Sequence, residues 1–430
     1  MAEFDVAVVG AGAAGLLAAS RAAERGLRTT LLEKNPRPGV KILMSGGTRC
    51  NLTHHTDRRG IIRAFGDQGR FLHSPLASLG PAELVALVEA EGVATKVEET
   101  GKVFPASNKA ADILHAFTRR LGRSGCEVQL GRGVLGLQPT ADGWQLDTTT
   151  GPLTCRGVII ATGGKSYPGC GTTGDAYAWL QGLGHTIVSP RPALVPLTSS
   201  ETWLPDLAGI TLPDVAVAVV AAGPPGTGTP GNTGTQGVPI PTDSRLPVDR
   251  GSFLFTHRGV SGPAVLNVSR GLTHLANPST ALLQCNFLPH MSTPEFDQLL
   301  RDRVTAYGRK AVLGVLSDLL PQRVLQLLLP RAGIPPERRC ADLSKEQRLA
   351  LTRELQQCRL PLTGSLGYAK AEVTAGGVQL DEVDSRTMSS RRHPCLFLAG
   401  EVLDLDGPIG GFNFQAAFST GWLAGDRILA

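Results

Sequence analysis

The stretch "FDVAVVGAGAAGLLAASRAAERGLRTTLLEK", residues 4–34, decides the fold of this 430-residue chain. Residues 4–9 are apolar and rich in β-branched side chains, which predicts a buried strand. An alanine-rich helix is expected to follow as far as about Arg25, and residues 28–32 predict a second strand that Glu33 closes. A strand, a glycine turn, a helix, a strand and an acidic residue in this order are typical of a dinucleotide-binding unit.

The glycines of this unit have separate roles. Gly10 makes the tight turn, Gly12 lets the backbone approach a pyrophosphate, and Gly15 allows the helix to pack closely on the strand. The start of the helix faces the phosphates, and Glu33 is placed to bind a ribose hydroxyl. The predicted cofactor contacts in this unit are Gly10, Gly12, Ala13, Ala14, Gly15, Glu33 and Lys34.

The glycine spacing alone is a weak signal in a chain with 52 glycines. The pattern GxGxxG starts at residues 10, 131, 169 and 226, and only the first match has strand, turn, helix, strand and acid in order. The match at 226 lies in a Gly/Pro/Thr-rich stretch, 223–245, that predicts a flexible loop. We therefore expect one nucleotide site, at the first match.

The composition predicts a globular protein of two or three domains, with 42% hydrophobic and 18% charged residues. No apolar run reaches the roughly 18 residues that a membrane span needs. The N-terminus carries Glu3 and Asp5 where a secretory signal has basic residues. The eight cysteines form no CxxC pair, which argues against a zinc site and against a dithiol redox site. We expect a cytoplasmic protein with reduced thiols, no metal and no membrane partner.

The net charge of +5 is unevenly distributed along the chain. Residues 301–348 hold ten Lys/Arg and five acidic residues, and residues 37–70 hold seven Lys/Arg and two acidic residues. A basic face favours an anionic partner. A solvated helix surface explains the same charges equally well.

The sequence after Glu33 favours FAD over a nicotinamide dinucleotide. Residues 35–55 are expected to form a long loop instead of a further strand–helix–strand unit. The runs "CEVQL", "GVLGL", "GWQLDTTTG" and "LTCRGVIIATGG" then predict a small antiparallel meander whose last strand returns to the nucleotide site. Residues 395–425 add a strand, a glycine-rich turn and a helix whose start can face the flavin pyrimidine ring.

Six segments carry a wider pattern: "GAGAAGL" (10–16), "GVKILMSGGTRCNLT" (39–53), "ATGGKSYPGCGTTGDAY" (161–177), "FTHRGVSGPAVL" (255–266), "AEVTAGGV" (371–378) and "AGEVLDLDGPIGGFN" (399–413). In this order, along nearly the whole chain, they resemble the BaiN/RdsA family of NAD(P)/FAD-dependent oxidoreductases, also called aminoacetone-oxidase-like flavoproteins. Two features depart from the family pattern. Thr48 stands where the family often has glycine, and residues 223–245 look like an insertion.

The resemblance implies an α/β fold with a discontinuous Rossmann-like FAD-binding domain, of the flavoprotein type with two dinucleotide-binding domains. Its two parts would be residues 1–190 and 361–430, with a β-rich inserted domain over 191–290 and a small helical domain over 291–360. The runs "DVAVAVVAA", "GSFLFTH" and "ALLQCNFL" predict strands of the inserted domain. The runs "PEFDQLLRDRVTAYG", "KAVLGVLSDLL" and "QRVLQLLLPRAG" predict short helices with basic faces.

The segment "SGGTRCN", residues 45–51, is expected to run along the cofactor towards its reactive ring. Its glycines would let the backbone come close, and Arg49 would offset phosphate charge or bind an anionic substrate. Cys50 would contact the cofactor or donate a proton to the substrate, and a small packed residue is the alternative. The further predicted cofactor contacts are Lys41, Gly46, Gly47, Arg49, Cys50, Asn51, Val134, Ala161, Thr162, Gly163, Gly400, Glu401, Gly410, Gly411, Phe412 and Asn413.

The resemblance implies an FAD-dependent enzyme that reduces a carbon–carbon double bond conjugated to a carbonyl. It implies two substrate types, uridine in 23S ribosomal RNA, reduced to dihydrouridine, and a steroid-like enone. The basic segment 301–348 favours ribosomal RNA as the partner. An amine oxidase and a flavoprotein that only binds a partner stay open as alternatives. NAD(P)H is the expected electron donor, although the sequence shows no site for it. His257 and Ser261 would line the substrate side or cap a turn.

Overall fold

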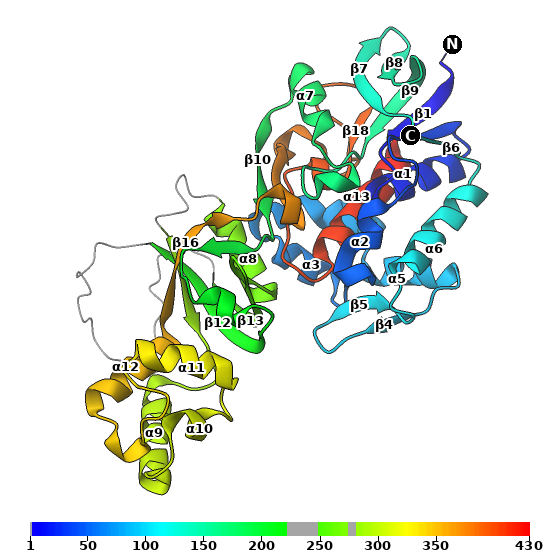
Figure 1. The fold of residues 1–430 in the computed structure, drawn as a ribbon. Helices are drawn as coiled ribbons and strands as arrows, with labels where there is room; N and C mark the ends of the chain where they lie inside the picture. Colours follow the sequence, from blue (N-terminus) through cyan, green and yellow to red (C-terminus); the bar gives the residue numbers. More distant parts are fainter. Residues whose placement is uncertain (1, 222–247, 274–280) are drawn as a thin grey trace. The chain divides into compact units, whose positions relative to one another are not determined.

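The computed structural model describes residues 2–221, 248–273 and 281–430. The predicted loop 223–245, with its GxGxxG match, lies outside the described residues. The chain divides into two compact units, Met1–Pro192 with Tyr368–Ala430 and Ala193–Gly367. Figure 1 shows the elements of both units. The β-rich and helical segments both belong to the second unit, and the four-part division of the chain stays a prediction.

The first unit is built on a sheet of seven strands: β1 (Phe4–Val9), β2 (Thr29–Glu33), β6 (Glu127–Leu130), β7 (Val134–Thr140), β8 (Gly143–Thr148), β9 (Leu153–Ile160) and β18 (Leu396–Leu398). Their order is β6-β2-β1-β9-β8-β7, and β18 also pairs with β9. The pairs β1–β2, β1–β9, β2–β6 and β9–β18 are parallel, whereas β7–β8 and β8–β9 are antiparallel. The predicted opening unit and the returning strand β9 are therefore confirmed.

One strand of the predicted meander lies elsewhere. The run "CEVQL" forms β6, which pairs in parallel with β2 at the edge of the sheet and not with β7. The helix α6 (Ala110–Arg123) precedes β6 and returns the chain to the same end of the sheet, so the connection fixes a parallel direction. The sequence suggests that β6 belongs to the meander because it lies close to β7 in the chain. The helix α6, which decides the direction of β6, lies before β6 in the chain.

The expectation of a loop over residues 35–55 is wrong in part. Val40–Thr48 form the helix α2, whose path breaks at residues 45–47, and the strand β3 (Thr53–His54) follows. Gly39 N donates a hydrogen bond to Ala11 O at 2.9 Å, which places the start of α2 beside the glycine turn. Ile42 is buried in the core of this unit. The helical part of α2 is therefore the apolar run before Ser45, held by the packing of Ile42, and Gly46 and Gly47 lie in the break.

Further elements of the first unit were not assigned from the sequence. The strands β3, β5 and β4 form a small antiparallel sheet in that order. The bounds are α3 (Arg58–Ala64), η1 (Gly66–Leu72), α4 (His73–Ser78), α5 (Pro81–Ala90), β4 (Thr95–Val97), β5 (Lys102–Pro105), η2 (Pro168–Cys170), α7 (Asp175–Gly182), β10 (Ile187–Ala193), η6 (Tyr368–Lys370), β17 (Val373–Val378), η7 (Leu380–Glu382) and η8 (Gly400–Val402). In the described part of the chain no single helix has the length and apolar composition of a membrane span, and only the bent pair Gly66–Ser78 and Pro81–Ala90 reaches them together.

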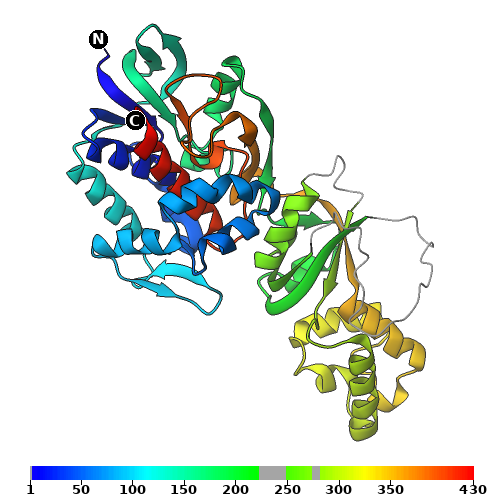
Figure 2. The same cartoon turned by 180° about the vertical axis from the view of Figure 1, so that it is seen from behind.

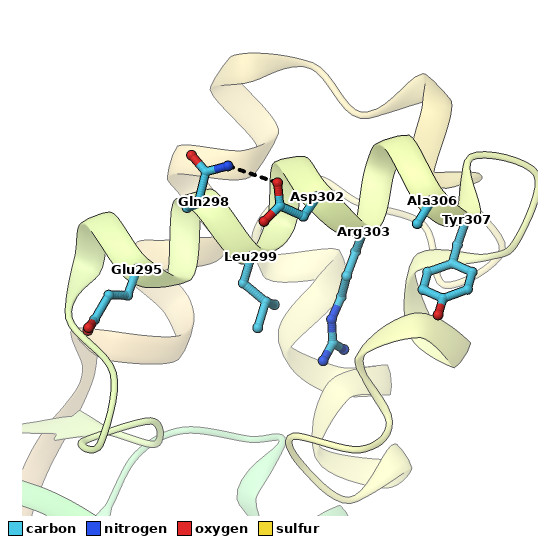
Figure 3. Close-up of a pocket in the computed structure, with 7 residues that line it drawn as sticks. All are labelled: Glu295, Gln298, Leu299, Asp302, Arg303, Ala306 and Tyr307. Atoms are coloured by element: carbon cyan, nitrogen blue, oxygen red, sulfur yellow. Dashed lines mark hydrogen bonds between the residues drawn. The ribbon is translucent and has the colours of Figure 1, made fainter.

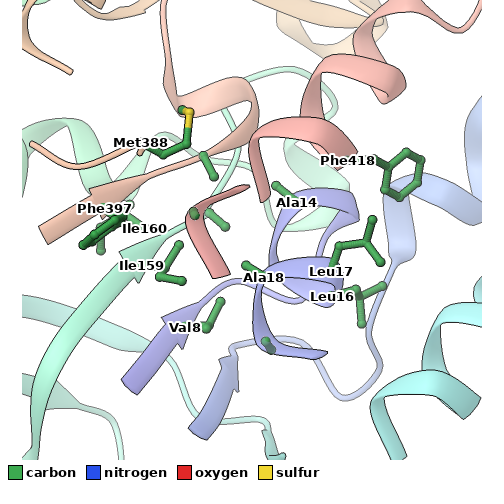
Figure 4. Close-up of a cluster of buried hydrophobic side chains, with 14 of the residues drawn as sticks. Val8, Ala14, Leu16, Leu17, Ala18, Ile159, Ile160, Met388, Phe397 and Phe418 are labelled. Carbon is green, nitrogen blue, oxygen red and sulfur yellow. The ribbon is translucent and has the colours of Figure 1, made fainter. Parts of the chain in front are cut away.

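The helices α1 (Ala13–Glu24) and α13 (Phe412–Arg427) lie side by side in both views of the first unit (Figures 1 and 2). They approach so closely that their contact needs glycine. A Cβ atom at Gly421 would lie 2.1 Å from Ala14 O, and one at Gly425 would lie 2.3 Å from Ala18 O. Figure 4 shows Ala14 and Ala18 of α1 facing this contact, above the strands that carry Val8 and Ile159. Small residues on both helices thus tie the C-terminal helix to the dinucleotide unit.

We expect Gly421→Ala to destabilise the protein, because the new methyl group must push α13 away from a backbone carbonyl. Overpacking of this kind costs about 1–3 kcal/mol. Gly122→Ala in α6 is the matched control, because a Cβ atom there meets nothing within 4 Å. A helical Gly→Ala change in open space should stabilise by roughly 0.5–1 kcal/mol. Urea unfolding of both variants measures the difference, and equal midpoints would contradict the close packing.

The second unit contains a closed barrel in the order β11-β14-β13-β12-β15-β16. Its strands are β11 (Leu197–Ser199), β12 (Thr211–Ala221), β13 (Val248–Thr256), β14 (Gly259–Ser261), β15 (Ala281–Asn286) and β16 (Cys358–Ser365), with helix α8 (Pro263–Leu272). The helices are α9 (Thr293–Tyr307), α10 (Val312–Leu316), α11 (Gln322–Arg331) and α12 (Lys345–Gln356), with η3 (Leu204–Leu207) and η5 (Cys340–Asp342). The three predicted strands and three predicted helices are confirmed, whereas β11, β14, β16, α8 and α12 were not predicted. Capping boxes at Ser292 and Ser344 start α9 and α12.

Candidate cofactor site

Three glycines shape the turn between β1 and α1, and their surroundings differ. A Cβ atom at Gly15 would lie 1.8 Å from Gly10 O, and one at Gly10 would lie 2.6 Å from Ala161 O. Gly10 also has a φ of +99°, in the left-handed region. A Cβ atom at Gly12 would meet no atom within 4 Å. Packing therefore requires glycine at positions 10 and 15, whereas Gly12 borders open space at the start of α1.

A buried hydroxyl without a partner lies beside this turn. Thr162 follows β9, and its Cα lies 3.1 Å from the Cβ position of Gly10. Within the described residues, the buried Thr162 Oγ1 has no hydrogen-bond partner. Leaving a buried polar atom unpaired costs about 1–3 kcal/mol. The predicted contacts Ala161, Thr162 and Gly163 thus lie where a polar ligand at the start of α1 would satisfy this hydroxyl.

Glu33 is buried at the end of β2, and its carboxylate already binds protein groups. Oε2 accepts a hydrogen bond from Ala11 N at 2.8 Å, and Oε1 accepts from Asn35 N and Asn35 Nδ2, both at 2.8 Å. A carboxylate has about four acceptor sites, so one stays available for a ligand hydroxyl. The predicted ribose contact fits this position. The sequence did not show the second role of Glu33, which is to hold the glycine turn against β2.

Lys34 follows β2 and lies next to Gly133, the residue that precedes Val134 at the start of β7. The Cβ position of Gly133 is 3.3 Å from Lys34 Cβ, and Val134 is half-buried. Lys34 Nζ pairs with Asp175 Oδ2 at 2.5 Å and donates to Thr173 Oγ1 at 2.8 Å. The ammonium group of Lys34 is therefore held at the start of α7. Only the backbone of Lys34 is left to line the site.

Lys41 and Glu401 form an ion pair between residues 360 positions apart, with 2.6 Å between Nζ and Oε2. Ser166 Oγ accepts from Lys41 at 2.6 Å and donates to Glu401 Oε1 at 2.5 Å. Thr374 N donates to the same carboxylate oxygen at 2.8 Å. Desolvation raises the pKa of Glu372, and the charge of Lys41 opposes this rise. A cofactor contact through the Lys41 ammonium group would have to share that group with Glu401.

The predicted segment 45–51 has a left-handed backbone over several residues. Gly46 and Gly47 have φ values of +56° and +66°, and Thr48 and Cys50 have +68° and +59°. A left-handed conformation costs a non-glycine residue roughly 1–2 kcal/mol. Glycine at position 48, as in the family pattern, suits this backbone better than Thr48. Gly47 borders open space, whereas a Cβ atom at Gly46 would lie 3.1 Å from Asn51 N.

Arg49 and Cys50 are both engaged by the protein. Arg49 Nη1 pairs with Glu98 Oε1 at 2.6 Å, and its guanidinium lies 4.0 Å from the ring centroid of Phe104. Cys50 is 0% exposed. Burial raises the pKa of its thiol to about 12, and a hydrogen bond with Ser45 opposes this rise. The structure surrounds the thiol with protein atoms on all sides, so its position favours a packing role.

Residues 51–54 contact the start of α13. This contact brings two groups of predicted site residues together, one at 46–51 and the other at 410–413. Asn51 Oδ1 accepts from Gly411 N at 2.9 Å in the amide orientation that satisfies both of its partners. His54 stacks on Phe412 with 4.6 Å between ring centroids, and its Nδ1 lies 3.1 Å from Gly410 O. Asn413 Oδ1 accepts from Gly407 N at 2.8 Å. Gly411, with a φ of +93°, precedes α13 without a side-chain cap, so backbone N–H groups open this helix.

The structure also brings in residues that the sequence reading missed. Glu98, Ser166 and Thr374 hold predicted site residues from distant parts of the chain. No local pattern marks them, because each is a common residue whose partner lies far away in sequence. Gly400, a further predicted contact, lies against α1, with its Cβ position 2.9 Å from Ala14 Cβ.

The second unit holds two other candidates. His257 is exposed in the hairpin between β13 and β14, and Ser261 pairs with Leu254 at the end of β14. Their predicted role on the substrate side stays a prediction. All eight cysteines are free thiols. In the described ranges, no group of three or more His, Cys, Asp or Glu side chains could hold a metal ion.

Comparison with known proteins places this geometry in a family. The family model described as "HI0933-like protein Rossmann domain" matches residues 4–427. The chain is 32% identical over 433 aligned residues to ribosomal RNA dihydrouridine synthase of Escherichia coli K12, covering 100% of this chain and 99% of that protein. It is 29% identical over 423 residues to 3-dehydro-bile acid delta(4,6)-reductase of Clostridium scindens, covering 98% of each. Among solved structures, 3-ketosteroid delta1-dehydrogenase of Sterolibacterium denitrificans shares the fold, with a TM-score of 0.51, 13% identity and 99% of both chains covered. These findings confirm the predicted family and fold class, and the chain belongs to the HI0933-like Rossmann family of flavoprotein oxidoreductases.

Proposed function

We propose that this protein is an FAD-dependent reductase that converts uridine in 23S ribosomal RNA to dihydrouridine. The observation that carries the proposal is the likeness to the Escherichia coli ribosomal RNA dihydrouridine synthase, which extends over the whole of both chains. A likeness limited to residues 1–190 would support FAD binding alone. Its extension through the second unit supports a shared substrate class as well.

The geometry fits FAD along the site described above. Gly12 leaves room for the pyrophosphate at the start of α1, and Glu33 keeps an acceptor position for a ribose hydroxyl. Thr162 would gain a partner for its buried hydroxyl. The uncapped start of α13 favours negative charge on a group placed before it. When bound, FAD supplies the hydride for the reduction. The other predicted cofactor contacts remain part of the proposal for this site.

The reduction also needs a proton for the substrate carbon next to the carbonyl. A general acid must reach that carbon, directly or through one water molecule. The Cys50 thiol is protonated at neutral pH, since its pKa is about 12, but protein atoms enclose it. We propose that Cys50 is a packing residue of segment 45–51 and that the proton comes from another group or from water.

We therefore expect Cys50→Ala to keep FAD and to keep a near wild-type rate of flavin reoxidation by substrate. Loss of a general acid would slow this step by about 10²- to 10⁴-fold. The stability should fall modestly, by about 1 kcal/mol, as in typical buried substitutions. Stopped-flow measurement of the reoxidation step tests this, with Cys50→Ser as the control that keeps a proton-carrying group. A large loss in Cys50→Ala that Cys50→Ser restores would instead assign the acid role to Cys50.

The electron donor and the place of action are part of the same proposal. We propose NAD(P)H as the donor, because a reductase must have its flavin reduced again after each turnover. We propose the cytoplasm as the location, because a ribosomal RNA substrate is found there.

A second candidate function is reduction of a steroid-like enone. The observation that favours it is the likeness to the bile acid reductase of Clostridium scindens, which also covers nearly the whole chain. Uridine and an enone share the chemistry of a double bond conjugated to a carbonyl. They differ in charge, and the basic residues of the second unit favour the polyanion.

An anaerobic half-reaction separates these candidates. The holoenzyme is reduced with dithionite and mixed with unmodified 23S ribosomal RNA, with a steroid enone, or with buffer. We expect the RNA to reoxidise the flavin and to contain dihydrouridine afterwards. Rapid reoxidation by the enone with none by RNA would support the second candidate. Reduction of the oxidised holoenzyme by an amine would support an amine oxidase.

A further inference from the structure

The basic segment 301–348 contains ten cations, and the structure divides them into two groups. Four are held in ion pairs: Arg301 with Asp297, Arg303 with Asp318, Arg331 with Glu201 and Glu354, and Arg348 with Asp297. Arg323 donates to Asp206 O. The count of basic residues in the sequence therefore overstates the charge free for a partner, because half of these cations already have protein partners.

Four of the remaining cations gather at one place, where α9 ends. Two stretches of backbone run antiparallel there, with Ala341 N donating to Gly308 O at 3.0 Å, Cys340 N to Lys310 O at 3.0 Å and Val312 N to Arg338 O at 2.8 Å. Ala311 and Arg339 form the bridge between them. We call the cations Arg309, Lys310, Arg338 and Arg339, with Tyr307, the α9-end patch.

Three cations of the patch, Arg309, Lys310 and Arg339, are exposed, and Arg338 is half-buried. Val312 and Cys340 are buried on the inner face of this short ladder, whereas Arg309 and Arg339 are exposed. Arg309 lies in the turn that follows α9, and Arg339 lies in the bridge with Ala311, so the hydrogen bonds between the two stretches hold both residues at the same end of α9. None of the four cations is in an ion pair with any residue that the structure describes. Like charges left together without counter-charges are costly, unless an anion binds there.

An exposed aromatic ring completes the patch. Tyr307 is 46% exposed, and Lys310 Nζ lies 4.8 Å from its ring centroid. The ring stands at the end of an open depression of about 470 Å³ along α9, which Figure 3 shows. Glu295 lies at the other end of that depression, and Asp302 lies between Glu295 and Tyr307, next to Arg303 in the sequence. An anionic partner would thus contact the Tyr307 end and avoid the rest of α9.

We infer that the α9-end patch is a docking surface for the RNA substrate, with Arg309 and Arg339 on backbone phosphates and Tyr307 stacked on an unpaired base. The inference rests on the proposed function, because it takes RNA as the partner. Cations beside an exposed aromatic ring are typical of surfaces that bind single-stranded RNA. The cations bind the phosphates, and the flat apolar ring stacks on a base. A protein partner with an acidic surface would use the cations but would not depend on the ring.

The first test is the affinity of the holoenzyme for unmodified 23S ribosomal RNA, measured over a range of salt concentrations. In Arg309→Gln/Arg339→Gln, the slope of log affinity against log salt should fall by about 1.4–1.8, because each lost phosphate contact removes about 0.7–0.9. The matched control is Lys345→Gln/Arg353→Gln, which removes the same charge from exposed positions of α12 outside the patch. Its salt slope should stay at the wild-type value. Equal slopes for the patch variant and the wild type would overturn the inference, and so would equal losses in patch variant and control.

The second test addresses the ring. Tyr307→Ala should weaken RNA binding by about 5- to 100-fold, the effect of one lost base stack, whereas Tyr307→Phe should bind like the wild type. Tyr307→Ala binding like the wild type would overturn the stacking role. Assays of bound RNA for dihydrouridine separate this inference from the proposed function. If the wild-type enzyme binds RNA with the predicted salt slopes but forms no dihydrouridine, the result would contradict the proposed function and would still support the docking surface.

Discussion

Gly12→Asp should weaken FAD binding by about 10³-fold while leaving the protein at least as stable as the wild type. Gly12 is the N-cap of α1, with an extended backbone (φ −81°, ψ −168°) that an aspartate adopts without strain. A Cβ atom there meets nothing within 4 Å, and aspartate is a preferred N-cap residue, so the apoprotein accommodates the change. The same carboxylate would stand against the pyrophosphate. Two like charges about 4 Å apart repel by roughly 4 kcal/mol at an effective dielectric constant of about 20. This corresponds to a loss of about 10³-fold in affinity.

Thermal unfolding of the apoprotein and titration with FAD measure the two effects separately. Gly15→Ala is the contrasting variant, because its new methyl group would lie 1.8 Å from Gly10 O and should lower stability and FAD affinity together. A Gly12→Asp protein that binds FAD like the wild type would remove the start of α1 from the site.

Glu33→Ala should lower both FAD affinity and stability, because Glu33 has two partner residues in the protein and is proposed to bind a ribose hydroxyl of FAD. A hydrogen bond to a charged group contributes about 1.5–3 kcal/mol, so FAD should bind roughly 10-fold weaker or worse. The change also leaves the buried Ala11 N–H without its partner, which costs about 1–3 kcal/mol of apoprotein stability. FAD titration and urea unfolding of the apoprotein give the two values.

Glu33→Gln is the control that separates these roles. Its side-chain oxygen keeps an acceptor, so apoprotein stability should lie between those of the wild type and Glu33→Ala. Unchanged FAD affinity in both variants would remove Glu33 from the ribose site and leave it as a support of the glycine turn.

The parts of the fold that local patterns encode were predictable. In residues 4–34, apolar β-branched runs, a glycine turn and an alanine-rich helix each favour one structure, and all of them agree. Gly26 ends α1 with a φ of +84°, as its position predicts. The barrel strands β12, β13 and β15 are predictable for the same reason, since runs of apolar residues mark strands of a buried sheet.

The parts that depend on distant contacts were not predictable. The direction of β6 follows from the packing of α6, and the helix α2 forms in a glycine-rich segment because Ile42 enters the core. The same limit applies to the site. The sequence predicts Lys41 in a glycine-rich loop near the cofactor, yet it lies in α2 and its partner Glu401 is 360 residues away. No local pattern shows that Cys50 is enclosed. The burial of a single residue depends on which other segments pack against it, and local sequence patterns do not show this.

The most direct test of the central claim is a map of dihydrouridine in 23S ribosomal RNA from cells with and without this gene. The proposed function predicts that a dihydrouridine is lost without the gene and returns with a wild-type copy. A Gly12→Asp copy should not restore it, because its site binds FAD only weakly. An unchanged dihydrouridine map in cells without the gene would contradict the proposed function.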